Sequence, residues 1–177
     1  MDSVSITELR KRFVVVFPDI VKLCEIYIKN IRPYIKPAKI LTLHQKANLA
    51  RLTLYIKTDK NIQLVNNVEL ICLLKGACKE KIDQQLLSQK LMIVSINKEE
   101  FCIQSLFYEL IEIIAKHQKK LDIKSIYEQL DRCLTLEMKQ QMFGKNIFAA
   151  ATFCKLIKIH EQTYYKRCKK GTENAEY

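Results

Sequence analysis

Residues 101–114 are FCIQSLFYELIEII, and this stretch decides the fold class. In a helix it places apolar side chains on nearly every side, which is typical of a helix buried by its neighbours all round. The whole chain of 177 residues holds only 3 Gly and 3 Pro. So few chain breakers favour long helices with short connections over a turn-rich β-sandwich. The sequence therefore predicts an all-α fold.

Apolar residues at helical spacing predict further helices on both sides of this stretch. Ser5, with Glu8 three residues later, forms a capping box that opens a short helix over 5–13. Phe13–Phe17 is compatible with a strand, but no second strand signal accompanies it, so an apolar helix end is favoured. Other helices are predicted from Pro18 to the Pro33–Pro37 connection, over 41–57, 62–75 and 79–92, as two short helices within 122–142, and through the small-residue run at 148–151 to 158.

This pattern predicts two stacked helical bundles. The first covers residues 1–93, and the second, shorter bundle covers 94–170. Residues 171–177 are expected to form a polar, frayed tail.

The formal net charge is +11, and residues 1–60 alone hold 12 basic and 5 acidic side chains. A positive field attracts nucleic acid, an anionic membrane or an acidic protein, although a general richness in lysine gives the same number. Apolar runs such as Phe13–Phe17 are too short to cross a bilayer, so no membrane partner is expected. The 7 cysteines are odd in number and form no CxxC pair, which favours free, buried thiols in a reducing compartment.

No catalytic arrangement is evident in the sequence. It contains no Gly-rich phosphate loop, no GxSxG and no HExxH, and its three histidines stand in polar stretches. We therefore expect a non-enzymatic protein with no metal, no cofactor and no small-molecule substrate.

Two lysine clusters are candidates for DNA contact. A helix-turn-helix outline spans 64–91, where Lys75, Lys79 and Lys81 surround the turn after Gly76 and stand where lysine reaches phosphates. Any helical bundle contains such turns, so this signal is not specific. The second cluster lies within 155–170, where aromatic residues interleave with basic ones. A solvated basic helix end is the alternative there. Its basic members are Lys155, Lys158, Lys166, Arg167, Lys169 and Lys170, with Tyr164 and Tyr165 between them, and the first four of these basic residues are the predicted DNA contacts.

The order of these features resembles the sixth, smallest subunit of the eukaryotic origin recognition complex. That family is built from two cyclin-like helical folds related to transcription factor IIB. The similarity is carried by the order and spacing of apolar helix motifs rather than by any single motif. The motifs are Pro18-Asp-Ile-Val-Lys22, Leu74-Lys-Gly-Ala-Cys-Lys-Glu80, Phe101-Cys-Ile-Gln104 and Phe148-Ala-Ala-Ala-Thr-Phe-Cys-Lys-Leu-Ile-Lys158.

The resemblance implies two cyclin-like bundles, the second shortened, because the chain ends soon after the matched Cys154-Lys155 pair. The family's acidic-aromatic docking helix has no counterpart. By resemblance, the chain is expected to bind the phosphate backbone of double-stranded DNA through Lys75, Lys79, Lys81, Lys155 and Lys158. The resemblance further implies a nuclear protein that acts with other origin recognition complex subunits in DNA replication initiation. The alternative is a helical protein-interaction adaptor that binds no nucleic acid.

Overall fold

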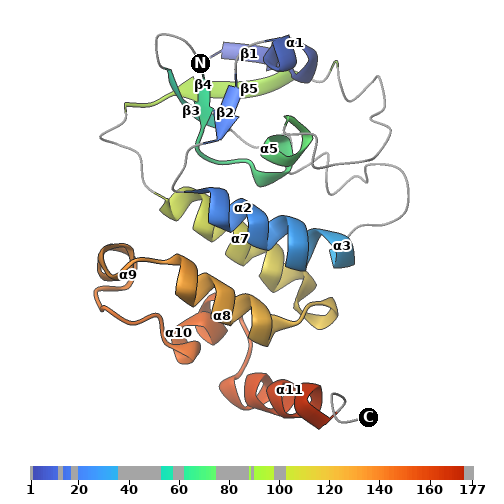
Figure 1. The fold of residues 1–177 in the computed structure, drawn as a ribbon, viewed down its shortest axis with the longest axis vertical. Coiled ribbons are helices and arrows are strands. Elements are labelled where there is room, and N and C mark those ends of the chain that lie inside the picture. The colour runs from blue at the N-terminus through green and yellow to red at the C-terminus, as the bar shows by residue number, and fades with distance from the viewer. Residues whose placement is uncertain are drawn as a thin grey trace.

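The computed structural model shows a mixed α/β fold, so the all-α prediction was wrong. A five-stranded sheet occupies one end of the molecule, and the helices of the second half of the chain occupy the other (Figure 1). The two termini lie at opposite ends. The structure describes residues 2–11, 14–16, 20–35, 53–57, 62–74, 88, 90–97 and 103–173.

The sheet has the strand order β1-β5-β3-β4-β2 and joins segments far apart in the sequence. β5 lies between β1, to which it is antiparallel, and β3, to which it is parallel. β4 pairs antiparallel with β3 and parallel with β2. The five strands are β1 (Asp2–Ser5), β2 (Val14–Val16), β3 (Thr53–Lys57), β4 (Ile62–Leu64) and β5 (Lys90–Ser95).

The helices of the first half lie between these strands in the order of the chain. They are α1 (Ile6–Lys11), α2 (Val21–Ile26), the π-helical turn η2 (Tyr27–Ile31), α3 (Arg32–Ile35) and α5 (Val68–Leu74). From residue 104 onward, the described residues form helices and the short connections between them. It contains α7 (Gln104–His117), the 3-10 turn η4 (Gln118–Lys120), α8 (Ile123–Cys133), α9 (Leu136–Phe143), α10 (Ala150–Leu156) and α11 (Glu161–Glu173).

Several segments predicted to be helical contain strands, although the second part of the segment 62–75 is the helix α5 (Val68–Leu74), as predicted. One physical reason accounts for the strands. Val14–Val16, which was favoured as a helix end, forms β2. The predicted helices over 41–57, 62–75 and 79–92 contain β3, β4 and the first residues of β5. Apolar runs this short fit a helix or a strand, and pairing with distant segments decides between them. The two cyclin-like bundles implied by the resemblance are therefore not the architecture of this chain.

Other local predictions are confirmed. The Ser5 hydroxyl accepts a hydrogen bond from the Glu8 amide at 3.1 Å, and the Glu8 carboxylate accepts one from the Ser5 amide at 2.7 Å. From Gln104 to residue 114 the apolar stretch forms most of α7, which is buried on most sides.

The prediction that Pro33 ends its helix was wrong. Pro33 lies inside α3, and the wider η2 turn comes just before it. Proline has no N–H to donate to the carbonyl four residues back, and a widened turn relieves the clash between its ring and that carbonyl.

One cluster of buried residues runs from Val4 to Tyr164, through the sheet end and the helical end alike. α2 packs against α8, and α5 packs against α7. α2 and α7 form the middle level of the molecule, between the sheet and α8 (Figure 1). The predicted boundary between residues 93 and 94 stays a prediction.

A buried carboxylate from α7 holds the start of α5. Glu109, 5% exposed, accepts hydrogen bonds from the backbone amides of Asn67 at 2.8 Å and Val68 at 3.0 Å. An anion at a helix N-terminus is stabilised by the free amides and the helix dipole. Asn67 adopts a left-handed conformation, with φ of 65°, and its side chain also donates to Thr53 Oγ1 on β3 at 3.0 Å. The sheet, α5 and α7 are thereby tied together in the core.

A second buried carboxylate, Glu69 of α5, ties that helix to the α2–α3 region. Its Oε1 accepts from Arg32 Nη2 at 3.1 Å and from Arg32 Nε at 3.3 Å. Its Oε2 accepts from the Tyr27 hydroxyl in the π-helical turn. Burial, together with the Glu69 carboxylate, raises the pKa of Tyr27 well above its ordinary value.

We predict that Glu69→Gln destabilises the protein strongly, because it removes the carboxylate that opposes the buried Arg32 guanidinium. Breaking a buried ion pair on one side costs about 3–5 kcal/mol. Urea unfolding followed by circular dichroism measures the loss. Glu25→Gln is the matched control, because Glu25 pairs with Lys29 at the surface, where such pairs are worth about 1 kcal/mol or less. An equal, small loss in both variants would contradict the structural role of Glu69.

We predict that Tyr27 makes the protein less stable at high pH. Its pKa is raised in the folded state from an unfolded value of 10.0, so stability is present below pH 10 and falls above it. The fall is about 1.4 kcal/mol for each pH unit above that value. Tyr27→Phe removes this part of the decline, which unfolding curves of both proteins at pH 8 and pH 11 measure. An identical decline in the two proteins would contradict the assignment.

Candidate nucleic-acid interface

Lys155 and Lys158 lie at the end of α10, and the way that helix ends fixes their position. The amide of Lys158 donates to the Lys155 carbonyl at 3.2 Å, and the amide of Ile159 donates to the Cys154 carbonyl at 3.0 Å. These two bonds form a Schellman motif, in which the residue after the helix end is left-handed and is usually glycine. Here it is Lys158, with φ of 59°. Both lysine side chains are exposed.

Lys166 and Arg167 lie on α11, which docks through its aromatic side. Tyr164 is buried, with its ring 6.1 Å from that of Tyr127 and 6.3 Å from that of Phe153. Arg167 is half-buried, and its Nη1 donates to the Gln118 carbonyl at 3.3 Å. Lys166 is exposed. The helix therefore directs Arg167 inward and leaves Lys166 to solvent.

Gln118 joins three segments at one place. Besides accepting from Arg167, it donates through its side-chain Nε2 to the Ile157 carbonyl at 3.3 Å. Gln118 opens η4 directly after α7, so the end of α7, the end of α10 and the middle of α11 meet here. We call the cationic residues around this meeting point the basic junction. They are Lys119, Lys120, Lys155, Lys158, Lys166 and Arg167.

The charges of the basic junction are not neutralised by ion pairs in the part of the chain that the structure describes. Five of its six side chains are exposed lysines. Two cations on α8 and α9 are paired instead: Lys139 pairs with Asp131 at 2.6 Å, and Arg132 pairs with Glu128 at 3.6 Å. Unpaired cations gathered from three segments produce a local positive field that attracts a polyanion.

The sequence found four of these six residues and missed two. Lys155, Lys158, Lys166 and Arg167 were predicted, and the contacts of Gln118 join the two segments that carry them. Lys119 and Lys120 were missed. The run of basic residues after the apolar helix, 116–120, was the available signal, but the Gln118 contacts that bring it to α10 and α11 are tertiary.

The other predicted DNA-contact residues, Lys75, Lys79 and Lys81, lie outside the described residues. α5 ends at Leu74, and the chain from Lys90 onward forms β5, where the second helix was predicted to end. The rest of the predicted second helix also lies outside the described residues, so the helix-turn-helix stays a prediction.

The other candidate functional groups among the described residues are possible metal ligands, thiols and histidines. Among them, no group of three or more His, Cys, Asp or Glu is placed to hold a metal ion. Five cysteines are described as free thiols: Cys24, Cys72 and Cys154 are buried, as predicted, whereas Cys133 and Cys168 are half-buried. His160 caps α11, where its Nδ1 accepts from the Gln162 amide at 3.3 Å. None of the described helices is long and apolar enough to span a membrane.

Comparisons with protein-family models, with curated protein sequences and with solved structures each find no match to this chain.

Proposed function

We propose that this protein binds the phosphate backbone of double-stranded DNA through the basic junction, without catalysing a reaction. The observation that carries the proposal is that Gln118 joins the end of α7, the end of α10 and α11, three segments that each carry exposed lysines. Lysine side chains that meet phosphates release condensed counterions, which gives affinity without reading the base sequence. The net charge of +11 adds long-range attraction.

The proposal depends on charge and geometry and not on the family resemblance. The origin recognition role, the other subunits as partners and the nuclear location all came with that resemblance, which implied a cyclin-like fold. Since the first half of the chain contains a mixed sheet, those points stay predictions.

Lys158 supports the proposal independently. A residue other than glycine in a left-handed conformation costs free energy, of order 1 kcal/mol. Glycine would satisfy the same helix end without that cost. A lysine held there is explained if its exposed ammonium group has a use, and phosphate contact provides one.

A protein-interaction adaptor is the second candidate, because two large apolar side chains are exposed near α9. Leu136 is 67% exposed and Ile147 is 69% exposed. α9 itself has no fully buried residue. If the protein binds no duplex at low salt, this apolar surface becomes the leading candidate site.

We predict that Lys119→Gln/Lys120→Gln weakens binding to a random duplex and flattens its salt dependence. Each lost phosphate contact reduces the slope of log K against log salt by about one. Fluorescence anisotropy at several salt concentrations measures both. Lys57→Gln/Lys90→Gln is the control, because it removes the same charge from exposed positions on the sheet. Equal slopes for the two double variants would show that only net charge matters and would overturn the assigned site.

We predict that Lys158→Gly lowers the affinity for duplex DNA without destabilising the folded protein. The left-handed position accepts glycine, so stability should stay within about 1 kcal/mol of the parent or rise. Duplex affinity should fall, because one phosphate contact is lost. Thermal unfolding and the same anisotropy titration give the two readings. Unchanged duplex affinity would remove Lys158 from the interface.

A further inference from the structure

Two helices end at the basic junction, and one series of hydrogen bonds caps both ends. Gln118 is the C-cap of α7, and its carbonyl accepts from Arg167 Nη1 of α11 at 3.3 Å. Ile157 is the C-cap of α10, and its carbonyl accepts from Gln118 Nε2 at 3.3 Å. The last carbonyls of a helix have no partner within it, so donors from other segments complete both ends. We call Arg167, Gln118 and Ile157 the linked C-caps.

Each of the linked C-caps has an exposed lysine as its direct neighbour in the chain. The pairs are Gln118 with Lys119, Ile157 with Lys158, and Arg167 with Lys166. The hydrogen bonds that join the caps therefore fix the backbone from which these lysines project, while the lysine side chains remain in solvent. Fixed attachment points reduce the conformational entropy that is lost when several lysines meet phosphates together.

The linked C-caps also bear on the alternative explanation for these lysines. A helix C-terminus has a partial negative charge, and a nearby lysine can serve only to complement it. Here the carbonyls of Gln118 and Ile157 accept from a guanidinium and an amide. Ile157 is fully buried, so its carbonyl would be costly to leave unpaired. Because other side chains meet this need, the lysine ammonium groups are available to an external anion.

Arg167 differs from its lysine neighbours in where its charge is directed. It is half-buried, and its guanidinium donates to the Gln118 carbonyl. Tyr164, three residues earlier, is buried, with its ring next to those of Tyr127 and Phe153. Residues three apart lie on one face of a helix. Arg167 and Tyr164 therefore dock α11 together, and the Arg167 guanidinium meets protein instead of solvent.

We propose that Gln118 and Arg167 are positioning residues for duplex binding and make no phosphate contact themselves. They hold the three neighbouring lysines in one arrangement. The inference rests on the proposed function, and it gives Arg167, a predicted DNA contact, a different part in it. Without the linked C-caps the same lysines remain, but fewer of them meet phosphates at one time. Duplex affinity then falls without any change in net charge.

Gln118→Met tests this at constant charge, because the new side chain has a similar length but cannot donate to the Ile157 carbonyl. Fluorescence anisotropy with a random duplex at several salt concentrations gives the slope of log K against log salt, which reports the number of phosphates neutralised. We expect the slope to become shallower by about one for each lysine that is no longer held. Gln140→Met, at an exposed position of α9, is the matched control and should keep the parent slope.

The salt slope distinguishes positioning from a loss of folding. A variant that is only less stable has a smaller folded fraction, which lowers K by the same factor at each salt concentration and leaves the slope unchanged. Urea unfolding of each variant, followed by circular dichroism, gives the folded fraction independently. A shallower slope in a folded Gln118→Met protein is therefore the expected result.

A second pair of variants compares two neighbouring cations of α11. Lys166→Met and Arg167→Met each remove one charge. Lys166→Met should make the slope shallower by about one, because one phosphate contact is lost. Arg167→Met should make it shallower by about two, because both Lys166 and Lys119 lose the hydrogen bond that fixes their backbone.

Two results would overturn the inference and leave the proposed function in place. One is the parent slope in Gln118→Met. The other is an equal slope in Arg167→Met and Lys166→Met, which would make Arg167 one more phosphate contact. If the parent protein does not bind the duplex at low salt, the proposed function itself is wrong, and the inference is wrong with it.

Discussion

Two buried carboxylates on or against α5 are the constraint on which the rest of the structure depends. Glu109 reaches from α7 to the first amides of α5, and Glu69 reaches from α5 to Arg32 and Tyr27. A buried charge is costly unless every neighbour that satisfies it is in place. The two carboxylates therefore admit one arrangement of α2–α3, α5 and α7. Because α2 in turn packs on α8, the position of the helical end of the molecule depends on this arrangement.

The sequence predicted best where structure is local. The Ser5 capping box, the apolar helix α7 and the short helices α8 and α9 depend on residues within a turn or two of one another, and each was found. The strands were missed. β5 does alternate, with Leu91 and Ile93 buried and Met92 exposed, but its partners are Asp2–Ser5 and Thr53–Tyr55. Pairing over such distances leaves no mark within a short window of sequence.

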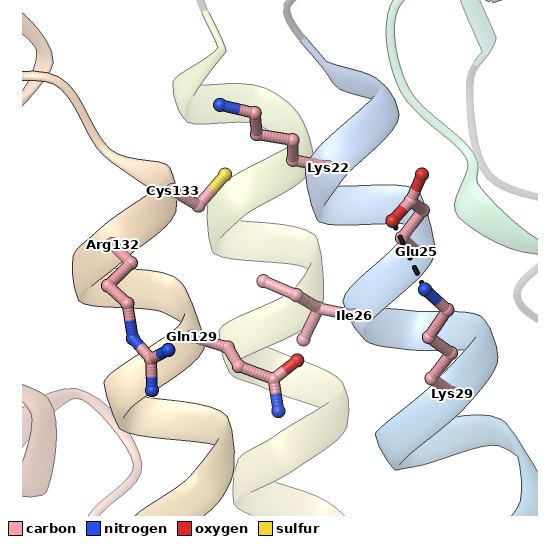
Figure 2. Close-up of a pocket in the computed structure, with 7 residues that line it drawn as sticks. All are labelled: Lys22, Glu25, Ile26, Lys29, Gln129, Arg132 and Cys133. Atoms are coloured by element: carbon pink, nitrogen blue, oxygen red, sulfur yellow. Dashed lines mark hydrogen bonds and ion pairs between the residues drawn. The ribbon is translucent and has the colours of Figure 1, made fainter.

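The candidate sites divide in the same way. Basic residues that are close in sequence, such as Lys155 and Lys158, were recognisable as a cluster. Lys119 and Lys120 join them only through the contacts of Gln118. A groove between α2 and α8, which Lys22 and Arg132 help to line (Figure 2), could not be predicted either, because these two residues are 110 residues apart in the chain. The buried role of Glu69 was also missed, because a glutamate in an apolar helix gives no sign of which distant cation it will meet.

The position of β5 in the sheet has a consequence for how the protein is made. β5 separates β1 from β3, so a growing chain has no complete sheet until residue 95 has left the ribosome. Glu109, which caps α5, follows later still. During synthesis β1 cannot pair with β5 until about ninety further residues have been made. Such long-range pairing is slow and exposes strand edges while it is pending. The N-terminal half thus becomes native only after α7 emerges, and the all-helical C-terminal half, with its local contacts, follows it closely.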